Sequence, residues 1–388
     1  VFTFIILVHL IKRIFNAVMD FYLEIIQHFF VRNLLLFSLV VFACAFVLSL
    51  KSFPLIVYIS YFKNIIVVPN ERSSHSQKTP YLGGLGISFG SFFVSSFFGA
   101  LILSGSDLSI VLAITSALIL LLTAGIKDDI IGLSPLKKII IEVVSALIFI
   151  LLTDIRIDNF YGLFGINEIS VFISYIFTIF VFIIIINSYN LIDGIDGLAA
   201  SLAILILSIL LFYFISTKML LPILAISSML GALVAFMRYN LFSVKRKIFM
   251  GDGGSLVVGF TLAYLSIMVL NTSLAESSFN FPHKPVFILS LFAFPLLDTL
   301  RVMILRVYNK KSPFCADKNH LHHLFLKNGF THLKSTVFIT LYSLLVIIIS
   351  FYFSDYDILK HFIFSLIGSI VTLFMLILIL NRKVKNEN

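Results

Sequence analysis

The chain contains few cysteines and few charged residues. Only Cys44 and Cys315 are cysteines, the first in an apolar run and the second in a polar one, so no disulfide framework is expected. Charged residues make up 12% of the 388 residues against 60% hydrophobic residues, and a soluble globule of this length would need far more polar cover. No internal repeat, low-complexity linker or soluble domain interrupts the pattern. The composition therefore predicts a polytopic membrane protein.

Long apolar runs predict an all-α bundle of about 11 transmembrane helices, within a range of about 10 to 12, because about 20 apolar residues cross the hydrocarbon layer. The apolar stretch 1–31 is interrupted by charges, so we treat it as an N-terminal extension that either spans the membrane or lies at its interface. Residues 32–388 are expected to form one membrane-embedded domain. The predicted spans are 34–50, 85–103, 109–126, 139–153, 171–187, 198–215, 219–237, 255–270, 286–305, 336–353 and 361–381.

The net charge of +9 would be compatible with nucleic-acid binding, but its distribution points to a membrane topology instead. Loops on one side of the predicted spans carry 19 Lys and Arg residues, and loops on the other side carry 4. The positive-inside rule makes the first side cytoplasmic, together with the C-terminus. We therefore expect contacts with membrane lipids and none with nucleic acid.

Five polar clusters fall in loops of this basic side. Because they share one face of the membrane, they are expected to form one site. They occupy residues 69–84, 127–138, 187–197, 238–255 and 306–323.

The third cluster places Asp193 and Asp196 directly after an apolar run. A carboxylate at the edge of hydrocarbon costs several kcal/mol unless water, a cation or a donor compensates it, so the pair is typical of a functional site. If the two residues begin a helix, their spacing puts both on one face, where they could hold a metal ion.

The side chains of these clusters narrow the chemistry. Carboxylates are hard oxygen ligands suited to Mg²⁺ or Mn²⁺, and cationic or imidazole side chains beside them would offset the charge of a polyphosphate. Phosphoryl-group chemistry therefore fits best. The carboxylates are Asp128, Asp129, Asp193, Asp196 and Asp252, and the accompanying donors are Lys138, Arg246, His320, His322 and His323.

Each motif also has a simpler interpretation. The Asp128-Asp129 pair is compatible with a solvated helix end, and the segment 245–247 with a basic anchor to anionic lipid. The segment 251–255 (Gly-Asp-Gly-Gly-Ser) predicts either a phosphate-binding nest at a helix N-terminus or a turn with positive φ followed by Ser255 as N-cap. It lacks the Gly-Lys-Ser/Thr ending of a P-loop. The histidines of 320–323 with Cys315 could form a zinc site, although donation to phosphate fits the basic loop better.

The ordered motifs resemble those of the polyprenyl-phosphate N-acetylhexosamine-1-phosphate transferases, the membrane family that begins bacterial surface-polysaccharide and peptidoglycan lipid intermediates. The resemblance covers about residues 34–388. Its motifs, in order, are Glu71-Arg72-Ser-Ser-His75 with Gly83-Gly84, Asp128-Asp129, Asn187-x-x-Asn190-x-x-Asp193-Gly-x-Asp196-Gly, Phe249-Met-Gly-Asp252-Gly-Gly-Ser255, and Ser312-Pro-Phe with His320-x-His322-His323.

The resemblance implies transfer of a sugar 1-phosphate from a UDP-N-acetylhexosamine to undecaprenyl phosphate, with release of UMP and a requirement for Mg²⁺, Mn²⁺ remaining an alternative. It also implies a multi-pass protein of the bacterial inner membrane with its site on the cytoplasmic face, and it leaves a homodimer open. Asp252 resembles the magnesium ligand, with Asp193 and Asp128 as further candidates. The implied catalytic residues are Asp128, Asp129, Asp193, Asp196 and His322, and the implied substrate-binding residues are Lys138, Asn187, Asn190, Arg72, Arg246, His320 and His323.

Three details bear on the branch of the family. Gly132 stands where some members have a third carboxylate, and Tyr81 stands where many have Arg. The His-x-His-His spacing and Ser-Pro-Phe resemble the N-acetylglucosamine-type branch, whereas the peptidoglycan-type branch, which transfers phospho-MurNAc-pentapeptide, tends to have three consecutive His. GlcNAc 1-phosphate is therefore the expected group, with phospho-MurNAc-pentapeptide as the alternative.

A cation-coupled secondary transporter is the rival from another class, because its membrane carboxylates would bind a coupling ion. Such sites lie in the middle of spans. Here the carboxylates lie at span ends on one side and no inverted repeat is visible, so the enzyme is favoured.

Overall fold

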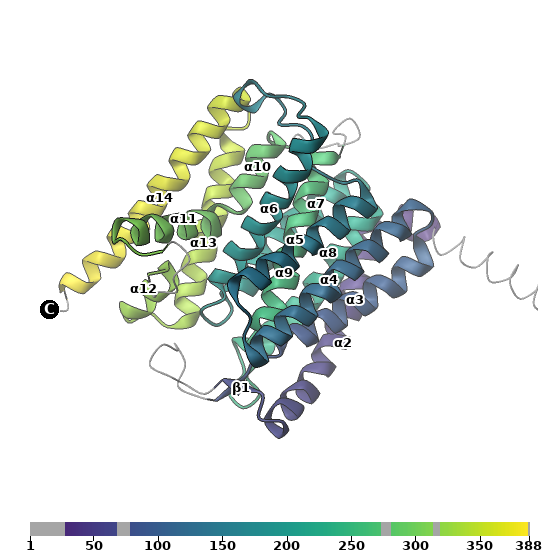
Figure 1. Ribbon diagram of the computed structural model, residues 1–388, viewed down its shortest axis with the longest axis horizontal. Coiled ribbons are helices and arrows are strands. Elements are labelled where there is room, and N and C mark those ends of the chain that lie inside the picture. The colour runs from purple at the N-terminus through teal and green to yellow at the C-terminus, as the bar shows by residue number, and fades with distance from the viewer. Residues whose placement is uncertain (1–27, 68–77, 273–280, 313–318, 387–388) are drawn as a thin grey trace, which may run out of the picture.

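The predicted all-helical membrane fold is confirmed in a computed structural model, which describes residues 28–67, 78–272, 281–312 and 319–386 (Figure 1). Residues 1–27 of the predicted extension 1–31 lie outside these described residues, as do Arg72 with its neighbouring motif residues and Cys315.

The described elements are almost entirely helices, joined by short loops and one two-stranded antiparallel pair. They are α2 (Leu34–Phe62), β1 (Ile66–Val67), β2 (Thr79–Pro80), α3 (Gly83–Ile102), α4 (Ser106–Ile131), α5 (Pro135–Thr153), the 3-10 turn η1 (Leu163–Gly165), α6 (Val171–Ile192), α7 (Leu198–Ser216), α8 (Leu220–Asn240), α9 (Gly251–Asn271), α10 (Lys284–Leu291), α11 (Ala293–Tyr308), α12 (Leu321–Lys327), α13 (His332–Tyr352) and α14 (Ile358–Asn386).

Every predicted span coincides with helix. Within the described residues, 9 helices are long and apolar enough to cross a membrane. Helix α5 is not one of them, since it carries Lys137, Lys138 and Glu142 over its 19 residues. The predicted span at 286–305 is broken in the structure, because α10 and α11 meet there at a bend of 68°; if this bent pair is one span, the described residues contain 10 candidate spans.

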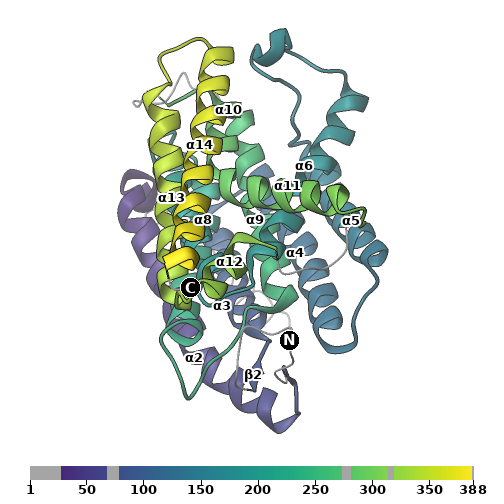
Figure 2. The same cartoon turned by 90° about the vertical axis from the view of Figure 1, so that its left-hand side faces the viewer.

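The bend has a local cause in Pro295. A proline in the first turn of α11 has no N–H to donate to the carbonyl four residues back, so α10 cannot continue through it as an unbroken helix. Figure 2 shows the result, with α11 running across the bundle while α13 and α14 run along it. The bend turns α11 toward the loops that carry the polar clusters.

Helix α9 forms the centre of the bundle in both views (Figures 1 and 2). Its residues from Gly253 to Val269 are all buried, and it packs against α3, α4, α6 and α7. A helix that is apolar all round is expected to be enclosed in this way. The first turn of α9, with Asp252, is consequently surrounded by the ends of its neighbours.

Glycine pairs allow this close packing. A Cβ on Gly84 of α3 would lie 2.2 Å from the backbone nitrogen of Gly254, and a Cβ on Gly125 of α4 would lie 2.4 Å from the Cα of Gly253. Small residues let helix backbones approach in membranes, where dispersion contacts rather than water exclusion hold helices together. The glycines at 253 and 254 therefore serve helix packing.

Replacement of Gly231 by Ala should destabilise the bundle, because the new Cβ would lie 2.2 Å from the carbonyl oxygen of Phe42 and force α8 away from α2. We expect a loss of about 1 to 3 kcal/mol, visible as a lower melting temperature in detergent. The matched control is Gly99→Ala in α3, whose Cβ would meet nothing closer than 3.6 Å. Equal melting temperatures for the two variants would contradict this packing.

Candidate functional site

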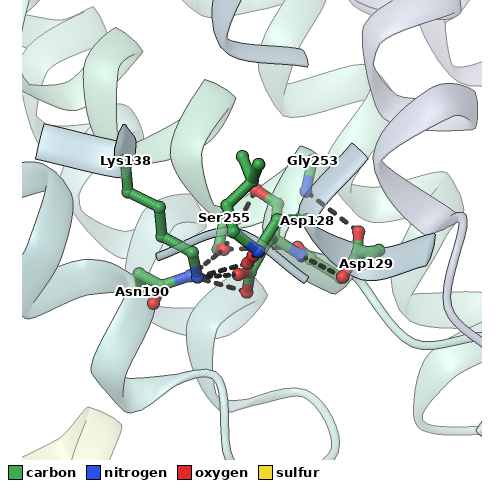
Figure 3. Close-up of polar contacts among 9 residues, drawn as sticks. Asp128, Asp129, Lys138, Asn190, Gly253 and Ser255 are labelled. Carbon is green, nitrogen blue, oxygen red and sulfur yellow. Dashed lines mark hydrogen bonds and ion pairs between the residues drawn. The ribbon is translucent and has the colours of Figure 1, made fainter. Parts of the chain in front are cut away.

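Two aspartates from distant parts of the chain converge on one lysine (Figure 3). Asp128 lies in the last turn of α4, Lys138 in the first turn of α5 and Asp252 in the first turn of α9. The Lys138 ammonium lies 2.6 Å from Oδ2 of Asp252 and also forms an ion pair with Asp128. Because the Lys138 side chain is 27% exposed, the cluster opens to solvent rather than lying sealed in the bundle.

Asn190, near the end of α6, completes this grouping. Its amide donates to Oδ1 of Asp252 at 3.0 Å and to the Ser255 hydroxyl at 2.7 Å. Asp193 follows one turn later as the C-cap of α6. We call Asp128, Lys138, Asn190, Asp193 and Asp252 the acidic centre.

The structure separates the roles of the aspartate pair. Asp129 turns away from Lys138 and accepts hydrogen bonds from the backbone amides of Asp252, at 3.0 Å, and Gly253, at 3.2 Å (Figure 3). These are amides that a helix N-terminus leaves without internal partners, and they favour an anion. Asp129 therefore caps α9, while Asp128 faces the cation.

This cap decides between the two interpretations of the glycine-rich segment. Two of the free amides at the helix N-terminus already donate to the Asp129 carboxyl oxygens. Gly251 has the positive φ that the turn interpretation requires, at 71°. The prediction of Ser255 as N-cap is wrong, because Ser255 lies inside α9 and donates back to the Gly251 carbonyl.

Asp193 has no side-chain hydrogen bond or ion pair among the described residues. Burial raises the pKa of its carboxyl well above the ordinary value, and the neighbouring charges of Asp252, Asp129 and Asp196 raise that pKa further. The hypothesis that Asp193 and Asp196 begin a helix is wrong, since α6 ends at Ile192 and α7 begins at Leu198. Their carboxylates diverge instead of sharing a helix face.

Glu142 is a buried carboxylate that the sequence analysis missed. It is 1% exposed on α5 and accepts a hydrogen bond from the side-chain amide of Asn187. The other oxygen of the Glu142 carboxyl has no partner among the described residues. The signal was a single charge within the apolar run 139–153, which hydropathy averages away. Asn187, a predicted substrate-binding residue, is thus held by Glu142 beside the acidic centre.

The acidic centre has the chemistry of a divalent-cation site. Carboxylates outnumber the single ammonium of Lys138, and two of them already share that one cation. No group of three or more His, Cys, Asp or Glu is arranged around a common metal position in the part of the chain that the structure describes. One or two carboxylates supplemented by water and phosphate oxygens is the usual environment of Mg²⁺, so the residues present fit such an ion.

Asp196 lies outside the acidic centre and joins three other elements. Its Oδ2 lies 2.6 Å from the Lys247 ammonium and 3.0 Å from Nδ1 of His332 on α13. Its backbone carbonyl accepts from the Thr336 hydroxyl at 2.9 Å, and the next residue, Gly197, donates to Asn240 at 2.6 Å. The structure thus places Asp196 as an anchor of the loop, and the prediction that it is catalytic is not tested by these contacts.

The histidine motif packs against the same loop at Gly194. A Cβ on Gly194 would lie 2.1 Å from Nε2 of His322, so the imidazole lies directly on the loop backbone. Burial lowers the pKa of His322 to about 3, with the charge of His323 adding to the effect, and His322 is therefore neutral near pH 7. The ring of His322 stacks 5.7 Å from that of His320 and lies 4.2 Å from that of His323, centre to centre.

Two predicted substrate-binding residues have no contact with the acidic centre that the described residues show. Arg246 is exposed in the loop between α8 and α9, and no contact places its guanidinium beside the acidic centre. Arg72 lies outside the described residues. Their proposed contacts stay predictions. The proposed zinc site stays a prediction too, because Cys315 lies outside the described residues.

Residues 110–270 match the family model of glycosyl transferase family 4. This range contains the whole acidic centre and ends before the histidine motif. Curated proteins from bacteria match shorter stretches of the chain. An undecaprenyl-phosphate alpha-N-acetylglucosaminyl 1-phosphate transferase of Escherichia coli (strain K12) is 36% identical over 116 residues, which is 29% of this chain and 30% of that protein.

Proteins of the same name give similar values in other bacteria. That of Yersinia pestis is 34% identical over 124 residues, 31% of this chain and 32% of its own length. That of Pasteurella multocida (strain Pm70) is 37% identical over 112 residues, 28% of this chain and 30% of its own. The matched part of the chain thus spans about 30% of the length of these curated relatives.

Replacement of Asp129 by Ala should loosen the start of α9, because the amides of Asp252 and Gly253 would lose their acceptor. Loss of a helix cap costs about 1 kcal/mol, so we expect a lower melting temperature and faster hydrogen exchange at these two amides. The control is Asp107→Ala, an exposed acidic residue in the first turn of α4. Unchanged exchange at positions 252 and 253 would rule out the cap.

Proposed function

The chain carries a glycosyl transferase family 4 segment at residues 110–270, and on that premise we propose that it transfers an N-acetylhexosamine 1-phosphate from a UDP-sugar to undecaprenyl phosphate and releases UMP. The observation that carries the proposal is the acidic centre, in which Asp128 and Asp252 share the Lys138 ammonium at the ends of apolar helices. Such a site is suited to a phosphate on a lipid and a diphosphate from solution.

In the proposed reaction an oxygen of the lipid phosphate attacks the β-phosphorus of the UDP-sugar. The new P–O bond forms as the bond from that phosphorus to the bridging oxygen breaks, and the bridging oxygen leaves on UMP. The lipid phosphate is largely dianionic near neutrality because its second pKa is about 6, so no strong base is required. Catalysis then depends mainly on positioning and on offsetting negative charge.

The chain's own residues can supply both the positioning of the substrates and the positive charge that offsets their phosphates. Lys138, with three N–H donors, can donate to phosphate oxygens while it remains near Asp128 and Asp252. Asn190 fixes the orientation of the Asp252 carboxylate through the bond at 3.0 Å. Asp252, with Asp128 and Asp193, would hold a Mg²⁺ ion, which when bound would neutralise charge on the diphosphate oxygens.

The histidine motif bears on the identity of the sugar donor, and the basic loops bear on the face of the membrane at which the site lies. The spacing of His320, His322 and His323 supports the N-acetylglucosamine-type branch, and the names of the relatives agree with it. The basic loops support a site on the cytoplasmic face of a bacterial inner membrane, where UDP-sugars are made. The product would be the first lipid-linked intermediate of a cell-surface polysaccharide.

The position of the carboxylates disfavours a transporter. Asp128 and Asp193 lie at the C-terminal ends of α4 and α6, and Asp252 lies in the first turn of α9. All three are therefore at helix ends rather than at mid-span, where transporter sites lie.

The reaction can be tested with purified protein, undecaprenyl phosphate, Mg²⁺ and a panel of UDP-sugars that includes UDP-GlcNAc and UDP-MurNAc-pentapeptide. We expect UMP release with UDP-GlcNAc and a lipid product whose mass has increased by one GlcNAc phosphate. UMP release only with UDP-MurNAc-pentapeptide would assign the peptidoglycan-type reaction. Release of UMP with none of the donors would overturn the proposal.

Replacement of Asp252 by Asn should reduce UMP release by about 100-fold or more, because it removes a charge aimed at the reacting centre with little change in shape. The measurement is the initial rate at saturating substrates. Asp107→Asn is the control for a surface carboxylate, and an unchanged melting temperature shows that the variant folds. Wild-type rates in the Asp252 variant would contradict its assignment.

Removal of divalent ions should abolish turnover, since one ammonium cannot neutralise both the aspartates and a diphosphate. We expect no UMP release in EDTA and recovery on adding excess Mg²⁺ or, to a lesser extent, Mn²⁺. Full activity in EDTA would exclude the metal requirement while leaving the transfer reaction itself open to the donor assay.

A further inference from the structure

Asp298 is a completely buried carboxylate that none of the sequence motifs includes. It lies on α11 with 0% exposure, beyond the residues 110–270 matched by the family model. In sequence it reads as part of the apolar run 286–305. A carboxylate at such a position is costly unless donors compensate it, so its partners indicate what it is for.

The partners of Asp298 all hold the start of the histidine motif. Oδ2 of Asp298 lies 2.9 Å from Nδ1 of His320, and Oδ1 accepts from the backbone amide of Leu321 at 3.1 Å. Arg301, one turn along α11, donates to the same Oδ1 at 2.8 Å and also to the carbonyl of Asn319. Residues 319–321 are therefore attached to α11 by two side chains, with Asp298 holding His320 and Leu321 and Arg301 holding the carbonyl of Asn319.

These contacts determine how the His320 ring is presented. With Nδ1 directed to Asp298, the other ring nitrogen, Nε2, is left without a partner among the described residues, although His320 is only 4% exposed. A buried polar atom without a partner costs about 1 to 3 kcal/mol. Such an atom is retained where a ligand supplies the missing partner.

The location of the ring indicates which ligand. His320 stacks nearly parallel on His322, with an angle of 12° between the rings, and His322 lies against Gly194 in the loop that begins with Asp193. The histidine motif and the acidic centre thus both reach this loop, at the neighbouring residues Gly194 and Asp193. A diphosphate held at the acidic centre is the nearest anion for which His320 could be a donor.

We infer that Asp298 is a positioning residue that orients His320 so that Nε2–H donates to a phosphoryl oxygen of the nucleotide-sugar, an assignment that rests on the proposed function. In this role the Asp298 carboxylate accepts a hydrogen bond from Nδ1–H, and its negative charge would compensate a ring that carries protons on both nitrogens. Asp298 itself does not touch substrate. Its action on the reaction passes entirely through His320 and the backbone of Leu321.

The first test is a pair of variants and their combination. Asp298→Asn keeps the shape but replaces one carboxylate oxygen by an NH₂ group, which cannot accept from His320 or, in the other orientation, from Leu321 and Arg301, so the ring loses its fixed orientation. We expect kcat to fall by about 10- to 1,000-fold with a smaller change in KM for undecaprenyl phosphate. Because both residues act through one ring, the D298N/H320N double variant should be no slower than H320N alone. Multiplicative losses would overturn the inference.

Two matched variants separate this role from a general loss of structure. Asp357→Asn removes the carboxylate of an exposed Asp357–Lys360 pair and should leave the rate unchanged. Arg301→Gln removes the guanidinium but keeps the bond between Asp298 and His320, so its loss should be smaller than that of D298N. If R301Q is as slow as D298N, or if D298N matches the wild type, Asp298 does not act by positioning His320.

The second test does not depend on enzymatic activity. Protein labelled with ¹⁵N in histidine side chains should give a His320 signal, assigned by its loss in H320N, with Nδ1 protonated and hydrogen-bonded. In D298N this signal should move, whereas in D357N it should not. An unprotonated Nδ1 in the wild type, or no movement in D298N, would overturn the inference. If the wild type releases no UMP, the proposed function fails, and the NMR result still decides whether Asp298 orients His320.

Discussion

Carboxylates at the edge of the hydrocarbon layer must be compensated by cations or hydrogen-bond donors, and the candidate functional site depends on this constraint. Asp128 and Asp252 lie 124 residues apart in sequence and share one ammonium, that of Lys138. Neither charge would be tolerated alone at the end of an apolar helix. The ends of α4, α5 and α9 are therefore held together by these ion pairs as well as by packing. The same excess of negative charge makes the centre receptive to a divalent cation.

This arrangement is possible only because α9 is approached so closely by its neighbours. Gly125 packs on the backbone of Gly253, which brings the end of α4 near enough for Asp129 to reach the free amides of α9. The cap orients the first turn of α9, and Asp252 in that turn then points toward Lys138. Backbone packing, the helix cap and the acidic centre are three consequences of one contact between helices.

A second set of buried polar contacts lies at the loop 193–197 and at the histidine motif that packs on it. The bend between α10 and α11 carries Asp298 beneath the histidine motif, and Asp196 joins the loop to Lys247 and His332. Both carboxylates are paired with cations or imidazoles. The loop that carries Asp193 is thus held in place by Lys247, His332 and His322, which is the rigidity that the proposed catalysis by positioning would require.

The sequence by itself determined the membrane class, the location of the helical segments and the gathering of Asp128, Asp193 and Asp252 in one region, because hydropathy and loop charge are local properties that add along the chain. It could not determine which partner each carboxylate takes. Only the tertiary structure directed Asp129 to α9 and Asp196 to Lys247, placed Glu142 and Asp298 inside the bundle, and bent the chain between α10 and α11. These choices depend on distances between residues far apart in sequence, where differences of a few ångströms decide which donor satisfies a buried charge.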